Sequence, residues 1–135
     1  MKKIVLDTNV LLVSISDRSK VHWVFDSLIK KKYILCVTTD ILAEYAEIIE
    51  RHMGAETSES IMGTIENLSN IELITAHFRF RLLKDEDDDK FVDCAISANA
   101  SYIVSHDKHF NVLKNIEFPK VKVIDTDRFK AELEK

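Results

Sequence analysis

One stretch near the start of the chain, Ile4-Val5-Leu6-Asp7-Thr8-Asn9, indicates how the fold begins. Its three apolar residues are typical of a short strand that is buried on both faces of a parallel sheet. The three polar residues that follow are common helix caps, so the strand is expected to lead directly into a helix. Asp7 would then lie at the carboxyl end of a buried strand.

The rest of the chain continues this alternation of strands and helices. Apolar and β-branched runs predict further strands at 33–38, 71–75, 102–105 and 121–124. Helical spacing predicts helices at 21–32, from a cap at Thr39 or Asp40 to near His52, within 54–70 with a cap around Ser58, at 90–100 after an acidic run, at 107–113, and from Thr126 onward. Residues 78–83 alternate too weakly to be assigned.

Strands that alternate with helices predict an α/β fold, here a three-layer α/β/α arrangement with a central, mostly parallel sheet. The 135 residues contain no internal repeat and no linker, so a single domain over residues 1–135 is expected. No run approaches the roughly 18 apolar residues of a membrane span, and the apolar run at the start is too short for a signal peptide. We therefore expect a cytoplasmic protein with no membrane association, whose Cys36 and Cys94 are free and buried.

Two acidic residues follow predicted strands, at the edge where such sheets bind ligands. Asp7 comes after the first strand, and Asp107 lies just past the strand 102–105. Each could instead be no more than a helix cap. His106 and His109 flank the second acid, and loop histidines of this kind are expected to be exposed.

Glu44 is a third candidate, because it lies at the edge of an apolar helical stripe. Ile41 precedes it by three residues and Ile48 follows it by four, whereas Glu47 and Glu50 point toward solvent. It is the acid of this helix that is expected to be partly buried. The competing interpretation is an ion-paired residue at the boundary of the core.

Asp89 and Asp93 are one helical turn apart, on a helix that is apolar almost all round. Such a helix should be buried, and unpaired buried charge is costly. The helix dipole explains an acid in the first turn, which covers Asp89 better than Asp93. Residues 85–88 are interpreted as a solvated charge run.

Together the acids predict a metal site. Two carboxylates about 4 Å apart repel by roughly 4 kcal/mol at an effective dielectric constant near 20. A divalent cation removes that cost, and Mg²⁺ prefers oxygen ligands. Without metal, at least one pKa of such a cluster should rise.

Four sequence blocks, in this order, resemble those of the PIN-domain family. They are Leu6-Asp7-Thr8-Asn9-Val10-Leu11, Thr39-x-x-Leu42-x-Glu44, Asp88-Asp89-Lys90-Phe91-x-Asp93-Cys94-Ala95 and Ile103-Val104-Ser105-x-Asp107. The resemblance covers nearly the whole chain and is greatest for the branch that holds the toxins of toxin–antitoxin systems. It implies a metal-dependent ribonuclease (a hydrolase) that uses Mg²⁺ or Mn²⁺ to cut single-stranded RNA, a homodimer, and a cognate antitoxin protein as partner.

The resemblance also carries over individual roles. Asp7, Glu44 and Asp107 match metal ligands of the family, and the third acid of the family's set is either Asp89, eighteen residues before Asp107, or Asp93 one turn later, or both. Three further residues match positions that orient the ligands or the water, namely Thr8, Asn9 and Ser105.

The net charge of −4 is unusual for a nucleic-acid binder, because basic surfaces drive phosphate affinity. The five candidate ligands account for it, since the remaining residues carry +1. Basic residues that would help to attract RNA, or are merely solvated, are Lys30 to Lys32, Arg79, Arg81, Lys84 and Lys108.

Other functions stay open at this point. A PIN fold with a weak site could act as an RNA- or protein-binding regulatory module, and a DNA nuclease would use similar acids. A phosphatase would need Asp where Asn9 stands, and a receiver domain would need an Asp after a central strand and a Lys after the last one.

Overall fold

A computed structural model describes residues 1–135 and shows a five-stranded parallel sheet. The strands are β1 (Lys3–Leu6), β2 (Ile34–Val37), β3 (Ile71–Leu73), β4 (Tyr102–Val104) and β5 (Val123–Ile124). Their order in the sheet is β3-β2-β1-β4-β5, so β1 is the central strand. All four pairings are parallel, which confirms the predicted fold class.

The position of β1 follows from its sequence. Ile4, Val5 and Leu6 have no exposed surface, as expected for a strand covered on both faces. β1 pairs with β2 through Ile4 and Leu35, and with β4 through Leu6 and Val104. The carboxyl ends of β1 and β4 therefore lie side by side.

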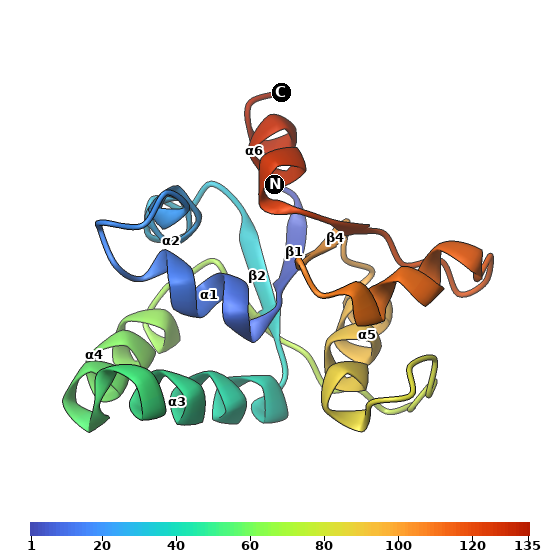
Figure 1. Cartoon of the computed structure of the whole chain (residues 1–135), viewed down its shortest axis with the longest axis horizontal. Coiled ribbons are helices and arrows are strands. Elements are labelled where there is room, and N and C mark those ends of the chain that lie inside the picture. Colours follow the sequence, from blue (N-terminus) through green and yellow to red (C-terminus); the bar gives the residue numbers. More distant parts are fainter.

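Helices cover both faces of the sheet (Figure 1). They are α1 (Thr8–Ser14), α2 (His22–Ile29), α3 (Thr39–Met53), α4 (Ala55–Glu66), α5 (Glu86–Ala98), the 3₁₀-helix η1 (Lys108–Asn115) and α6 (Thr126–Leu133). Right-handed crossovers place α1 to α4 on one face while the chain moves from β1 to β3, and α5 on the other face when it returns to β4. Figure 1 shows this division, with α1 to α4 to the left of the strands and α5 to their right.

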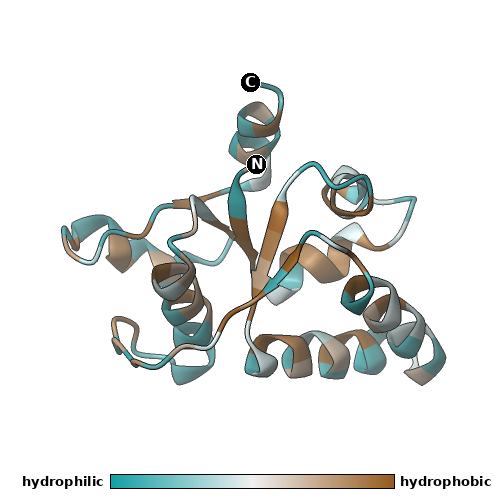
Figure 2. Cartoon of the chain, turned by 180° about the vertical axis from the view of Figure 1, so that it is seen from behind, coloured by the Kyte–Doolittle hydropathy of each residue, from teal (hydrophilic) through white to brown (hydrophobic).

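The core is a cluster of 28 buried apolar residues centred on the strands, which are the apolar centre of Figure 2. On the α6 side, Phe129 contacts the rings of Trp23 and Tyr33 at 5.5 and 5.1 Å between centroids. Cys36 and Cys94 are free and buried, as expected. No helix has the length and apolar character that crossing a bilayer requires.

Several helix boundaries differ from the sequence prediction. Thr38, not Thr39 or Asp40, caps α3, because its side chain accepts a hydrogen bond from the Ile41 amide at 3.2 Å. Gly54 precedes α4, and Ser58 lies inside that helix, where its hydroxyl donates to the carbonyl of Ala46.

Two further segments are α5, whose start differs from the prediction, and residues 78–83, which the sequence left unassigned. The helix α5 begins at Glu86, four residues earlier than predicted, with Asp85 as its cap. The ambiguous residues 78–83 form no regular element and run from β3 toward α5 across the carboxyl edge of the sheet.

Candidate metal centre

Asp7 lies where β1 ends, at the centre of the sheet. Its backbone N–H donates to the carbonyl of Val104 at 3.1 Å, which ties it to the end of β4. The residue is buried, and its side chain does not cap α1. Instead, its Oδ2 accepts a hydrogen bond from the Ser105 hydroxyl at 2.7 Å. The cap interpretation of Asp7 is thus wrong for its side chain.

The surroundings of Asp7 favour the protonated form. Burial is the main cause that raises the pKa of this carboxyl, and the negative charges of Asp107 and Glu44 raise it further. The Ser105 hydroxyl, which donates to Asp7, and the nearby Thr8 amide lower this pKa, because both favour the ionised form. A buried carboxyl that is held among like charges in this way is suited to bind a cation.

Asp107 is brought to Asp7 by the same serine. The Ser105 hydroxyl accepts a hydrogen bond from the Asp107 amide at 3.0 Å while it donates to Asp7. The Asp107 carboxylate also caps η1, since its Oδ1 accepts from the His109 amide at 2.9 Å. One oxygen is therefore used for the cap that the sequence indicated, and Oδ2 has no partner within the protein.

Glu44 approaches from α3. Its Oε2 accepts a hydrogen bond from the Thr8 hydroxyl, and its Oε1 forms an ion pair with Lys90 of α5 at 2.6 Å. The neighbouring Tyr45 attaches this turn of α3 to the end of β1, because its hydroxyl donates to the Leu6 carbonyl at 2.6 Å. Glu44 is half-buried, whereas the other acids of α3 are exposed, as the sequence predicted.

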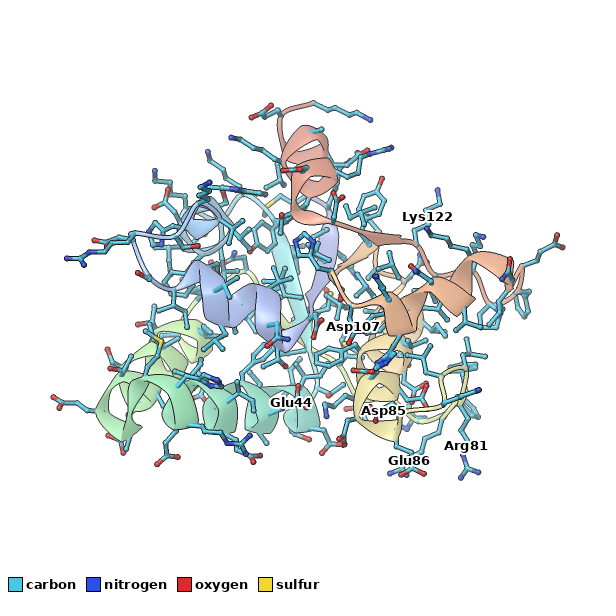
Figure 3. The ribbon with its side chains drawn as sticks, viewed as in Figure 1. Glu44, Arg81, Asp85, Glu86, Asp107 and Lys122 are labelled. Atoms are coloured by element: carbon cyan, nitrogen blue, oxygen red, sulfur yellow. The ribbon has the colours of Figure 1, made fainter.

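Two of the three predicted supporting residues make contacts with the acids. Thr8 and Ser105 are buried and donate to Glu44 and Asp7. Asn9 is exposed, and its side chain makes no hydrogen bond within the protein. Figure 3 shows Glu44, Asp85 and Asp107 reaching the same edge of the sheet from different elements.

Asp88 also faces this centre, and the sequence interpretation missed it. Only 16% of its side chain is exposed, so the expected solvated run holds for 85–87 but is wrong for Asp88. Burial is the largest cause that raises its pKa, followed by the charges of Asp107, Asp85 and Asp7. The available signal was its spacing, three residues before Phe91 and four before Val92, both of which are buried.

His109 completes this side of the centre. Its Nδ1 lies 3.3 Å from Asp88 Oδ2 and 3.3 Å from Asp107 Oδ1. One ligand atom from each of Asp85, Asp88 and His109 lies within 4.8 Å of the others. The imidazole is 67% exposed, in agreement with the sequence expectation, but it is directed at two carboxylates.

Asp89 and Asp93 lie on a different side of α5. Both are buried, yet Asp89 Oδ1 accepts a hydrogen bond from the Leu83 amide at 2.9 Å, and Asp93 Oδ1 accepts from the Phe80 amide at 3.0 Å. They hold the segment 78–83 and line a groove of about 480 Å³ with Arg79 and other residues. Their role as metal ligands stays a prediction.

The pKa of Asp93 reflects this location. Burial is the main cause that raises it, the Phe80 amide lowers it, the charge of Asp89 raises it and Arg79 lowers it. The structure thus brings Asp7, Glu44, Asp107 and Asp88 together, and places Asp89 and Asp93 against the segment 78–83.

The donor set fits a divalent cation. Carboxylates that follow β1 and β4, together with others from two helices, lie near enough to raise the pKa of Asp7 and Asp88, and a bound cation would offset their mutual repulsion. A PIN-domain profile matches residues 3–109 of the chain. The chain belongs to the PIN-domain family. This match spans all the acids considered above.

Solved structures with the same fold include PIN-domain proteins. The chain is similar to VapBC2 from Rickettsia felis, described as bound to a DNA fragment from their promoter, at 17% identity over 91% of this chain and 98% of that one, with a TM-score of 0.64. It is also similar to VapC20 from Mycobacterium tuberculosis, described as a Sarcin-Ricin loop cleaving toxin, at 14% identity over 80% and 92%, with a TM-score of 0.59.

The PIN domain endonuclease Utp24 is a third similar structure, at 16% identity over 91% of this chain and 84% of that one, with a TM-score of 0.52. No curated protein matches the sequence. At these identities the likeness concerns the fold of the PIN domain, and the role of each acid depends on its own geometry.

Proposed function

We propose that this PIN-domain protein is a metal-dependent endoribonuclease that hydrolyses phosphodiester bonds of single-stranded RNA with Mg²⁺ or Mn²⁺. The observation that carries the proposal is the Ser105 hydroxyl, which donates to Asp7 and accepts from the amide of Asp107, and so links two acids that follow different strands. Glu44 and Asp88 lie beside them. Four acids gathered at one edge of the sheet are suited to bind a cation.

The proposed ligands are Asp7, Glu44 and Asp107, with Asp88 as the fourth acid. Ser105 and Thr8 orient the carboxylates of Asp7 and Glu44. A bound Mg²⁺ or Mn²⁺ would acidify a water and neutralise charge on the phosphate. Hydrolysis would join the water oxygen to phosphorus and release the 3′ oxygen as a hydroxyl, which would give a 5′-phosphate and a 3′-hydroxyl. Asp89 and Asp93 would act by holding the segment 78–83.

The toxin role is a further part of the proposal. One of the similar structures is described as VapBC2 bound to a DNA fragment from their promoter, and another as a Sarcin-Ricin loop cleaving toxin. By this likeness, the chain would act as the toxin of a pair in the cytoplasm, as a homodimer held by a cognate antitoxin. A small neighbouring gene whose product co-purifies with the chain would support this role.

Cleavage of a mixed-sequence single-stranded RNA tests the activity. Wild type is expected to cut in Mg²⁺ or Mn²⁺ and to lose activity in EDTA, and Asp7→Asn is expected to be inactive while remaining folded. Equal cleavage in EDTA would exclude the metal mechanism. A single-stranded DNA of the same sequence, cut faster than the RNA, would favour the DNA nuclease.

The same assay separates the candidate third acids. Asp88→Asn is expected to lower the cleavage rate by at least tenfold, with a matching rise in the Mg²⁺ concentration needed for half-maximal rate. Asp89→Asn and Asp93→Asn are expected to leave that Mg²⁺ concentration unchanged. The reverse pattern would assign the ligand role to Asp89 or Asp93.

One observation favours a binding module with a weak site instead. Lys90 forms an ion pair with Glu44 at 2.6 Å, and so occupies an oxygen that a metal would use. If folded wild type binds RNA but neither binds Mg²⁺ in calorimetry nor cuts RNA, the regulatory module is the better assignment.

A further inference from the structure

A second groove opens directly from the metal centre, along η1. It has a volume of about 400 Å³ and runs between η1 and the start of α6. Ser105 and Asp107 line it and also belong to the metal centre. Figure 1 shows η1, in orange, running away from the end of β4. A strand whose scissile phosphate lies at Asp107 would therefore continue into this groove.

The basic side chains of this groove have free donors. Lys108 and Lys114 form no ion pair and no side-chain hydrogen bond within the protein. Arg128 uses its Nε to bind Glu132 at 3.1 Å, and its terminal nitrogens bind no other side chain. Of the two acids in the groove, Asp107 belongs to the metal centre, and Asp125 is used to cap α6.

The geometry of η1 places these donors in a row. In a 3₁₀-helix, side chains three residues apart eclipse one another, and the rise is about 2 Å per residue. Lys108, Asn111 and Lys114 are spaced by three and all line the groove. They therefore form a ridge in which successive residues are about 6 Å apart along the helix axis. Consecutive phosphates of an extended nucleic-acid strand are separated by a similar distance.

The other groove beside the centre has the opposite charge. The groove that holds Arg79 is lined by five acidic residues and three basic ones, and Lys90 among the basic ones is already paired with Glu44. A phosphate chain would be repelled there. Charge complementarity thus selects the groove along η1.

We propose that the η1 ridge of Lys108, Asn111 and Lys114 binds the phosphates of the RNA nucleotides next to the scissile bond. This inference rests on the proposed ribonuclease function. It predicts that the RNA strand runs from the metal centre along η1. Lys108 and Lys114 are thus RNA-binding residues, and their contribution to the affinity for RNA is electrostatic.

The test is the salt dependence of RNA binding in the cleavage-deficient Asp7→Asn protein. A fluorescent single-stranded RNA is titrated with Mg²⁺ present, at several KCl concentrations. Each phosphate contact contributes about 0.7 to the slope of log K against log salt for a single strand. The double variant Lys108→Gln/Lys114→Gln is expected to lower the slope by about 1.4 and to weaken binding roughly tenfold at low salt.

Two control variants make the result specific. Lys31→Gln/Lys32→Gln removes the same charge before β2, at the amino edge of the sheet, and should leave the slope unchanged. Lys108→Arg/Lys114→Arg should keep the slope of the parent protein. Equal slopes for the two glutamine variants would overturn the assignment alone. Absence of RNA binding by every form, together with inactive wild type, would overturn the assignment and the proposed function.

Discussion

The Ser105 hydroxyl donates a 2.7 Å hydrogen bond to Asp7, across 98 positions of sequence. It also accepts the Asp107 amide, so a single buried oxygen sets the spacing between the ends of β1 and β4. The two strands bring these residues together because they are neighbours in the parallel sheet. The spacing of the acids is thus a property of Ser105 as much as of the sheet.

Ser105→Ala is expected to destabilise the protein by about 1–3 kcal/mol, because it removes a hydrogen bond to a buried carboxylate and leaves the Asp107 amide unpaired. The pKa of Asp7 should rise further, since the serine lowers it. Urea unfolding at pH 7 measures the first effect. Ser101→Ala, at an exposed position, is the control, and an equal change in both variants would contradict the prediction.

Asp7→Asn is expected to stabilise the metal-free protein at pH 7. The folded pKa of Asp7 is raised above 3.8, so its contribution to stability is fully present below that pH and is lost as the pH rises through the folded pKa. The amide removes this loss. Thermal unfolding in EDTA should show a higher Tm for the variant at pH 7 and a smaller difference near pH 3.

In the presence of Mg²⁺, wild type should have a higher Tm than Asp7→Asn. Binding to the folded state raises the Tm of wild type, and Asp7→Asn should gain less because a proposed ligand is missing. Asp17→Asn, at an exposed position, is the matched control. An equal Mg²⁺-induced shift in all three proteins would argue against a metal site at Asp7.

Sequence patterns alone indicated the sheet, the placement of Asp7 and Asp107, and the partial burial of Glu44, since each follows from the period of one element. The location of Asp88 depends on where α5 begins, and the run of acids before Lys90 does not show at which residue the helix starts. The hydrogen bonds from Asp89 and Asp93 to residues 83 and 80 depend on a segment without regular structure. The spacing of apolar residues predicts regular helices and strands, and it cannot predict contacts with a segment of this kind.

Lys90→Met is expected to tighten Mg²⁺ binding severalfold. Lys90 neutralises Glu44 at 2.6 Å, and a bound cation would have to compete with it. The pair is partly exposed, so its removal should change the binding free energy by about 1 kcal/mol. Isothermal titration of wild type and variant measures this. Weaker binding in the variant would show that Lys90 supports the site, for example by orienting Glu44.

Asp93→Ala is expected to loosen residues 78–83 without unfolding the sheet. The buried carboxylate accepts the Phe80 amide, so its loss should speed hydrogen exchange in this segment by tenfold or more and leave β1 protected. Hydrogen exchange read by mass spectrometry is the measurement. Unchanged exchange at 78–83 would show that Asp93 does not hold the segment. Glu86→Ala, exposed on the same helix, is the control.

Glu132→Gln is expected to lower stability at neutral pH. The Glu132 side chain is 3% exposed and contacts Lys135, Lys2 and Arg128, which lower its pKa from 4.5 to about 2. A depressed pKa gives stability that is present above pH 4.5 and is lost as the pH falls toward 2. The Tm difference between wild type and variant should therefore shrink over that range. Glu134→Gln, at an exposed position, is the control and should leave the Tm at neutral pH unchanged.

The place of β1 at the middle of the sheet has a consequence during protein synthesis. Asp7 leaves the ribosome about a hundred residues before its partners at the end of β4, and the sheet cannot bring them together before then. A nascent chain would hold an incomplete set of acids until most of it has been made. The proposed ribonuclease activity would therefore arise only after the strand that carries Ser105 and Asp107 to Asp7 has been made.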